Sequence, residues 1–155
     1  MRIKGFVSGC LLLPLLCVPL SSRAGEGSIA STEISIGGIV IGETPAQVRK
    51  KLGKPLRESR TSGFLDLHYD YPAVRVSFNE QVVAGLESRS SQGCTPEKLC
   101  PGDSVERMRS LYGPPMVVDR ETGRYFEYYP EDHDCWLQIS ANAGKVKGVA
   151  VACQP

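Results

Sequence analysis

Two histidines are the first residues to consider for chemistry, because an imidazole can act as an acid–base group or as a metal ligand. His68 lies between Asp66 and Asp70. Two flanking carboxylates would suit an acid–base group, but the strict alternation around His68 favours the exposed polar face of a strand. His133 belongs to an acidic run at residues 131–134, whose carboxylates and imidazole are possible metal ligands. Four adjacent side chains reach one ion only in a special loop, so we expect a solvated turn and no metal site.

No other group of residues supplies the parts of a catalytic site. The serines have no motif around them that would make one of them a nucleophile. Gly37, Gly38 and Gly42 precede a predicted helix, but they lack the spacing and the lysine of a phosphate-binding loop. We therefore expect neither an enzyme nor a cofactor.

Four of the six cysteines, Cys94, Cys100, Cys135 and Cys153, lie outside the N-terminal targeting segment. An even number of cysteines in an exported chain indicates two disulfides, for which three pairings are possible. We favour Cys94–Cys100, which closes a short loop, and Cys135–Cys153, which would join two neighbouring strands. A zinc site made by these cysteines with His133 is the alternative, but no Cys-x-x-Cys pair is present.

Residues 1–24 have the pattern of a secretory signal peptide. A short basic region is followed by an apolar run at residues 11–20, and Ser22 and Ala24 are the small residues of a cleavage site. Pro14 and Pro19 interrupt the run, which is too short for a membrane span. A lipobox-like sequence ends at Cys10, but it precedes the apolar run instead of ending it, which disfavours lipidation. We expect cleavage near Ala24, no integral membrane span, and a periplasmic or secreted protein.

The balance of charges excludes one class of partner. Three of the 18 basic residues leave with the signal peptide, while all 17 acidic residues remain. The mature chain is therefore slightly acidic, and no basic patch indicates that it binds nucleic acid. About 130 residues suffice for one compact domain with a real core.

Two short helices with the same pattern position the rest of the chain. The first predicted helix has Thr44 at its N-cap, Pro45 at its first position and Gln47 where a capping box needs it. Gly53 then ends the helix. The pattern returns at an offset of 60, with Ser104 at the cap and Gly113 at the end. This repetition indicates an internal duplication.

Three alternating segments follow the first helix, at residues 64–71, 74–78 and 82–88. Alternation with a period of two predicts strands with one buried face. Matching segments follow the second helix. The sequence therefore predicts an α+β fold of two tandem repeats, each a short capped helix followed by a three-stranded antiparallel meander, with the helices on one face of the sheet. We place a flexible lead-in at 25–35, repeat 1 at 36–92 and repeat 2 at 93–155, within one compact mature domain.

The run Ile-Gly-x-Thr-Pro-x-x-Val-x-x-x-Leu-Gly-x-Pro at residues 41–55, followed by alternating strands, resembles the β-lactamase-inhibitor-protein-like fold. The same module is seen in the BamE (SmpA/OmlA) lipoproteins of outer-membrane barrel assembly. The resemblance covers about residues 36–153 and rests on helix caps and core positions. It implies a sheet with one open face and a function in binding other proteins, and it assigns no binding residue.

Large aromatic side chains mark the candidate binding surface. If Phe126 faces the core, then Tyr125, Glu127 and Tyr129 face the open side of the sheet, and the same argument turns Trp136 outward together with Gln138. A slip of one residue in register would instead place the two tyrosines in the core. The corresponding face of the first repeat is polar and carries Asp66, His68, Asp70 and Arg75.

Tyrosine, tryptophan and arginine are enriched at protein interfaces. We therefore expect the chain to bind another protein, as an exported inhibitor or an envelope-associated interaction protein. The eight residues expected to contact the partner are Tyr125, Glu127, Tyr129, Trp136, Asp66, His68, Asp70 and Arg75. The alternative is a small-ligand or peptidoglycan-binding module, in which the aromatic side chains stack on a sugar.

Overall fold

The computed structural model describes residues 25–154 and consists mainly of β-strands. The elements in chain order are a 3-10 turn η1 (Ser31–Glu33), β1 (Ser35–Ile36), β2 (Ile39–Val40), α1 (Pro45–Leu52), β3 (Arg57–Arg60), β4 (Leu67–Asp70), β5 (Arg75–Asn79), β6 (Val82–Ser88), α2 (Val105–Tyr112), β7 (Met116–Arg120), β8 (Gly123–Tyr128), β9 (Cys135–Asn142) and β10 (Lys145–Cys153).

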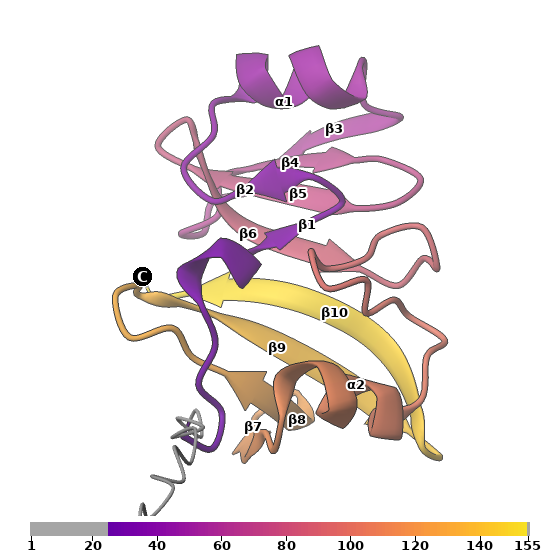
Figure 1. Ribbon diagram of the computed structural model, residues 1–155. Helices are drawn as coiled ribbons and strands as arrows, with labels where there is room; N and C mark the ends of the chain where they lie inside the picture. The colour runs from indigo at the N-terminus through magenta and orange to yellow at the C-terminus, as the bar shows by residue number, and fades with distance from the viewer. Residues whose placement is uncertain (1–24, 155) are drawn as a thin grey trace, which may run out of the picture.

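Eight strands form one antiparallel sheet in the order β3-β4-β5-β6-β10-β9-β8-β7. The two halves of the chain meet where β6 pairs with β10, with Leu86 opposite Val151 and Ser88 opposite Val149. Figure 1 shows β3, β4, β5 and β6 above this seam and β10, β9, β8 and β7 below it. The sheet is therefore continuous across the whole molecule.

The predicted fold class is wrong. Each helix is followed by four strands, not by a three-stranded meander, and all eight strands belong to one sheet in a mainly β molecule. The missed strands are β3 and β7, which form the two edges of the sheet. Most of their residues are exposed, so neither strand has the apolar alternation that identifies a half-buried strand.

Both helices begin and end as their sequences predict. Thr44 Oγ1 accepts a hydrogen bond from the backbone N–H of Gln47 at 3.3 Å, and Gln47 Oε1 accepts one from the backbone N–H of Thr44 at 2.7 Å. Ser104 Oγ accepts one from the N–H of Arg107 at 3.1 Å. The helices stop at Gly53 and Gly113, whose φ angles of 79° and 77° suit glycine.

The helices and the β1–β2 hairpin cover one face of the sheet (Figure 1). Val48 of α1 and Met108 of α2 are fully buried in the core. Between the helices, Ile36 and Ile39 of the hairpin are also fully buried, and β1 contacts both central strands, β6 and β10. Apolar side chains of both helices and of the hairpin thus pack on this face of the sheet.

The segment for which the sequence predicted a flexible lead-in, residues 25–35, is bonded to the second half of the chain. Gly27 donates its backbone N–H to the carbonyl of Pro114 at 2.8 Å and accepts a hydrogen bond from the N–H of Tyr129 at 2.6 Å. Ile34 is 1% exposed and belongs to the core. These contacts hold the segment beside the ends of β7 and β8.

The two disulfides join Cys94 to Cys100 and Cys135 to Cys153, the pairing that we favoured from the sequence. Cys135 and Cys153 are direct partners in the β9–β10 register.

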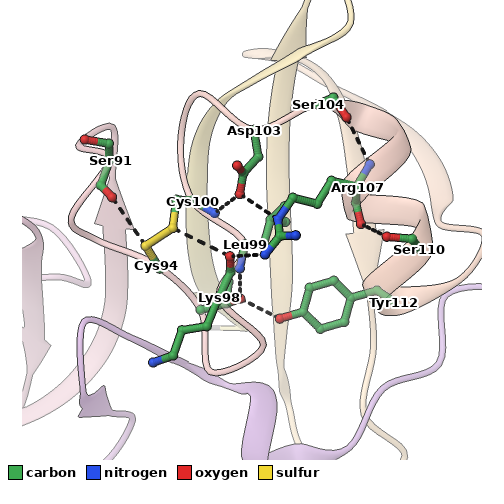
Figure 2. Close-up of polar contacts among 11 residues, drawn as sticks. Ser91, Cys94, Lys98, Leu99, Cys100, Asp103, Ser104, Arg107, Ser110 and Tyr112 are labelled. Carbon is green, nitrogen blue, oxygen red and sulfur yellow. Dashed lines mark hydrogen bonds and ion pairs between the residues drawn. A yellow bond between two sulfur atoms is a disulfide. The ribbon is translucent and has the colours of Figure 1, made fainter.

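The other disulfide closes the loop that leads into α2 (Figure 2). There Asp103 accepts hydrogen bonds from the backbone N–H of Cys100 at 2.8 Å and from Arg107 Nε at 3.3 Å. The Tyr112 hydroxyl donates to Thr95 Oγ1 at 2.6 Å. These bonds fix the linker between the halves.

Disulfides persist in oxidising compartments, so the two bridges support an exported protein. The predicted signal peptide and its cleavage site near Ala24 lie outside the described residues. Within residues 25–154, neither helix has the length and apolar character needed to cross a bilayer.

Candidate functional site

The candidate site lies on the face of the sheet opposite α1, α2 and the β1–β2 hairpin, which we call the open face. Because side chains alternate along a strand, Phe126 and Tyr128 of β8 point toward the core, while Tyr125, Glu127 and Tyr129 point to the open face. The pairing of Glu127 with Gln138 places Gln138 on the same face. Trp136, two residues before Gln138 in β9, joins them.

Glu127 is the centre of this group and its side chain is 0% exposed. Arg120 donates to both of its carboxylate oxygens, from Nε at 3.0 Å and from Nη2 at 2.7 Å. Gln138 Nε2 donates to Oε1 at 2.8 Å, and the Tyr129 hydroxyl donates to Oε2. A buried carboxylate with four donors is fully compensated, so the group is held in one arrangement.

The protonation states follow from these contacts. Burial acts to raise the pKa of Glu127, but the hydrogen bonds from Arg120, Tyr129 and Gln138 outweigh it and hold the pKa below its usual value. Burial, together with the hydrogen bond to Glu127, raises the pKa of Tyr129 to about 12. Glu127 is therefore an anion and Tyr129 a neutral donor at neutral pH.

Aromatic rings cover the ion pair. Tyr129 and Trp136 are stacked, with centroids 5.9 Å apart and an interplanar angle of 23°. The Arg120 guanidinium lies 5.3 Å from the centroid of the Trp136 ring, a favourable cation–π distance. Trp136 Nε1 is buried without a hydrogen-bond partner among the described residues. We refer to Arg120, Glu127, Tyr129, Trp136 and Gln138 as the aromatic cluster.

The first half of the chain presents a polar group on the same face. His68 Nδ1 lies 2.9 Å from Ser77 Oγ, and His68 Nε2 lies 3.3 Å from Thr61 Oγ1. Asp70 pairs with Arg75 at 2.6 Å, and this hydrogen bond lowers the pKa of Asp70. The ring nitrogens of His68 thus face hydroxyl groups.

A groove of about 510 Å³ lies on the open face and is lined by residues of β6, β8, β9 and β10. It follows the middle of the open face, where Gly148, Ala150 and Ser140 are small and leave the sheet uncovered. Tyr125 of β8 and Glu87 of β6 are among its lining residues. Polar and charged side chains make up much of its lining, and Gln138 is the member of the aromatic cluster that it includes.

The structure brings together the predicted residues Glu127, Tyr129 and Trp136. Tyr125 lies on the same face, and its hydroxyl is 2.9 Å from Thr122 Oγ1. The structure places His68 and Asp70 in β4, Arg75 in β5, and Asp66 directly before β4. One of them, Asp66, has a buried Oδ1 without a partner among the described residues. The role of all eight in binding a partner stays a prediction.

Sequence reasoning missed Arg120, which lies on the unpredicted strand β7. The available signal was a short run of β-branched residues, Val117 and Val118, shortly after Gly113 ends the helix. In the loop between β8 and β9, the residues of the acidic run 131–134 are exposed. Residues 25–154 contain no group of three or more histidine, cysteine or carboxylate side chains placed to hold a metal ion.

Comparisons with known proteins identify the fold but no family. No protein-family model and no curated protein matches the sequence. One similar solved structure is an extracellular protein containing an SCP domain from Bacillus anthracis, with a TM-score of 0.53 and 14% identity over 88% of this chain and 50% of the other. Another is a DUF4309 family protein (YjgB) from Bacillus subtilis, with a TM-score of 0.52 and 16% identity over 76% of this chain and 83% of the other.

The chain spans half the length of the SCP-domain protein, and at these identities the likeness concerns the fold alone. Neither structure is a β-lactamase inhibitor or a BamE protein, so the resemblance to that family stays a prediction.

Proposed function

We propose that this chain is an exported protein-binding module that contacts its partner through the open face. The aromatic cluster is the observation that carries the proposal. Tyrosine, tryptophan and arginine dominate the binding energy of protein interfaces, and here all three surround one buried carboxylate. Because their side chains are already held by hydrogen bonds and stacking, little conformational entropy remains to be lost when a partner binds.

The proposed partner spans the open face. One edge of its surface would rest on Tyr129 and Trp136, and the other would face the polar residues His68, Asp70 and Arg75. Such a module acts by covering a surface of its partner, as an inhibitor or as an envelope interaction protein does, and it needs no catalytic residue. In this proposal the mature chain begins after Ala24 and works in the periplasm or outside the cell.

A second candidate function is binding of a glycan such as peptidoglycan. Tyr125 lines the groove together with Thr122, Gln138 and Ser140, and an aromatic ring beside hydroxyl and amide groups suits a sugar. The glycan would occupy the groove of about 510 Å³, whereas a protein partner would also cover its two sides.

A capture experiment distinguishes the two functions. The purified protein, Trp136→Ala and a control variant are immobilised and exposed to envelope extract, culture medium and isolated peptidoglycan. The control is Val40→Ala, which changes a 47% exposed apolar residue on the opposite side of the sheet.

If the chain binds a protein, wild type and Val40→Ala should each retain one protein in stoichiometric amount. Trp136→Ala should bind that protein at least about tenfold more weakly, as expected for a hot-spot residue. Retention of peptidoglycan alone would support the glycan function. Equal capture by all three proteins would contradict both.

A further inference from the structure

The two edges of the sheet differ in character although they occupy equivalent places in the two halves. β3 and β7 each follow a helix stop and each end the sheet. β3 reads Arg-Glu-Ser-Arg, whereas β7 reads Met-Val-Val-Asp-Arg. Exposed edges pair readily with other chains, and proteins commonly prevent this with charged residues. β3 carries such protection along its length, and the first three residues of β7 do not.

Apolar side chains of β7 are open to solvent. Met116 is 45% exposed and Val117 is 55% exposed. Within residues 25–154, β8 is the only strand that pairs with β7, so the outer backbone groups of β7 have no strand partner. This edge therefore combines free hydrogen-bonding groups with exposed apolar side chains.

The apolar residues lie on both faces of the strand. Val117 is opposite Phe126 and shares the helix-covered face with it. Met116 is opposite Glu127 and Val118 is opposite Tyr125, so both belong to the open face. A strand added at this edge would meet apolar side chains above and below the sheet.

We propose that β7 pairs antiparallel with β7 of a second copy of this chain, about a twofold axis that passes by Val117. In this register Val117 faces its own copy, and Met116 of each chain faces Val118 of the other. All three apolar residues then contact apolar residues. A twofold axis at Val118 would instead oppose Val117 with Asp119 and Met116 with Arg120, which is a poorer set of cross-strand pairs.

This pairing would have a consequence for the open face. A twofold axis perpendicular to the sheet keeps each face on its own side, so the two sheets would continue as one. The two aromatic clusters would then lie near each other on the same surface, because Arg120 and Glu127 come from β7 and its neighbour β8. The dimer itself does not depend on the proposed function of that surface.

The strand is short, with five residues, and the contact is smaller than the standard interface of about 1,600 Å². We therefore expect a weak dimer, with a dissociation constant between about 10 µM and 1 mM. Such an equilibrium is measured by sedimentation of the purified protein at concentrations up to about 1 mM.

A charge at the twofold axis tests the interface. Val117→Asp places two carboxylates opposite each other and removes the apolar contact, which should raise the dissociation constant at least about tenfold. The matched control is Leu56→Asp, which makes the same type of change at the other edge, where Leu56 is 75% exposed. It should leave the dimer unchanged. A monomeric wild type, or equal dissociation constants for wild type and a folded Val117→Asp, would overturn the proposal.

Cross-linking tests the register independently of any loss of folding. Val117→Cys brings two thiols to directly opposite positions, where the Cα atoms are about 4.5–5.5 Å apart and can be bridged by a disulfide. Asp119→Cys places a thiol on the same face, but the Cα atoms of residue 119 in the two chains would be about 14 Å apart along the strands. Oxidation should therefore link Val117→Cys into dimers and leave Asp119→Cys unlinked. Equal linking of the two variants, or none of Val117→Cys, would overturn the register.

Discussion

At the scale of single residues, Glu127 determines how the aromatic cluster is organised. A buried carboxylate is costly unless it is fully hydrogen-bonded, and here Arg120, Tyr129 and Gln138 supply the donors. The same donors fix the positions of the side chains that we propose for binding. The charge of Glu127 therefore matters both for the stability of the protein and for the shape of its open face.

The first prediction concerns Glu127→Gln. Replacing charge-assisted hydrogen bonds by neutral ones should lower the free energy of unfolding at pH 7 by about 1–2 kcal/mol. Because the pKa of Glu127 is lower in the folded protein than in the unfolded chain, its contribution is complete at neutral pH and is lost as the pH falls through the folded pKa.

Urea unfolding of both proteins between pH 7 and pH 3 measures this contribution. The difference between wild type and Glu127→Gln should shrink with decreasing pH, because the protonated glutamic acid then resembles glutamine. Arg124→Gln is a suitable control, because its partner Asp119 is 71% exposed and such pairs contribute little. A difference for Glu127→Gln that stays constant with pH would contradict the role of its charge.

At the scale of elements, the helices show what the sequence could predict. Thr44 and Ser104 cap their helices as expected, and Gly53 and Gly113 end them, because these signals act within one turn of chain. Alternation likewise predicted β6 at its observed bounds, Val82–Ser88, and β5 to within a residue. Local signals with one strong physical cause were therefore reliable.

The edge strands and the sheet order were not predictable in the same way. Among the strands of residues 25–154, β3 and β7 each have a neighbour on one side only. Most of their side chains are exposed, so no apolar face marks them. The seam between β6 and β10 depends on contacts between residues about 60 positions apart, such as Ser88 and Val149. The alternation of β8 placed Tyr125 and Glu127 on the open face, but the ion pair to Arg120 required β7 and was missed.

The second prediction concerns the caps. Thr44→Ala and Ser104→Ala should each lower the free energy of unfolding by about 1 kcal/mol, because each removes the acceptor for one N–H of the first helical turn. Chemical denaturation monitored by circular dichroism gives these values. Ser110→Ala, in the exposed part of α2, should change stability by less than about 0.5 kcal/mol. An effect of Ser110→Ala as large as that of Ser104→Ala would contradict the capping argument.

At the scale of the whole molecule, the two halves share a plan but present different surfaces. Each contributes a capped helix and four strands to one sheet, and the β1–β2 hairpin covers the seam. The second half carries the aromatic cluster, whereas the same face of the first half carries His68 and the pair Asp70–Arg75. Two disulfides secure the linker before α2 and the β9–β10 pair. This asymmetry agrees with the proposed interface, in which one anchoring region has a polar surrounding.

The central claim, that the open face binds another protein, is tested most directly by photo-crosslinking in the native setting. A photoreactive aromatic residue is placed at Tyr125, which lines the groove, and in a separate variant at Val40 on the opposite side of the sheet. After irradiation, our account predicts a discrete adduct with one protein from position 125 that is absent from position 40 and is lost when Trp136→Ala is added. An adduct from position 40 alone, or none from position 125, would contradict it.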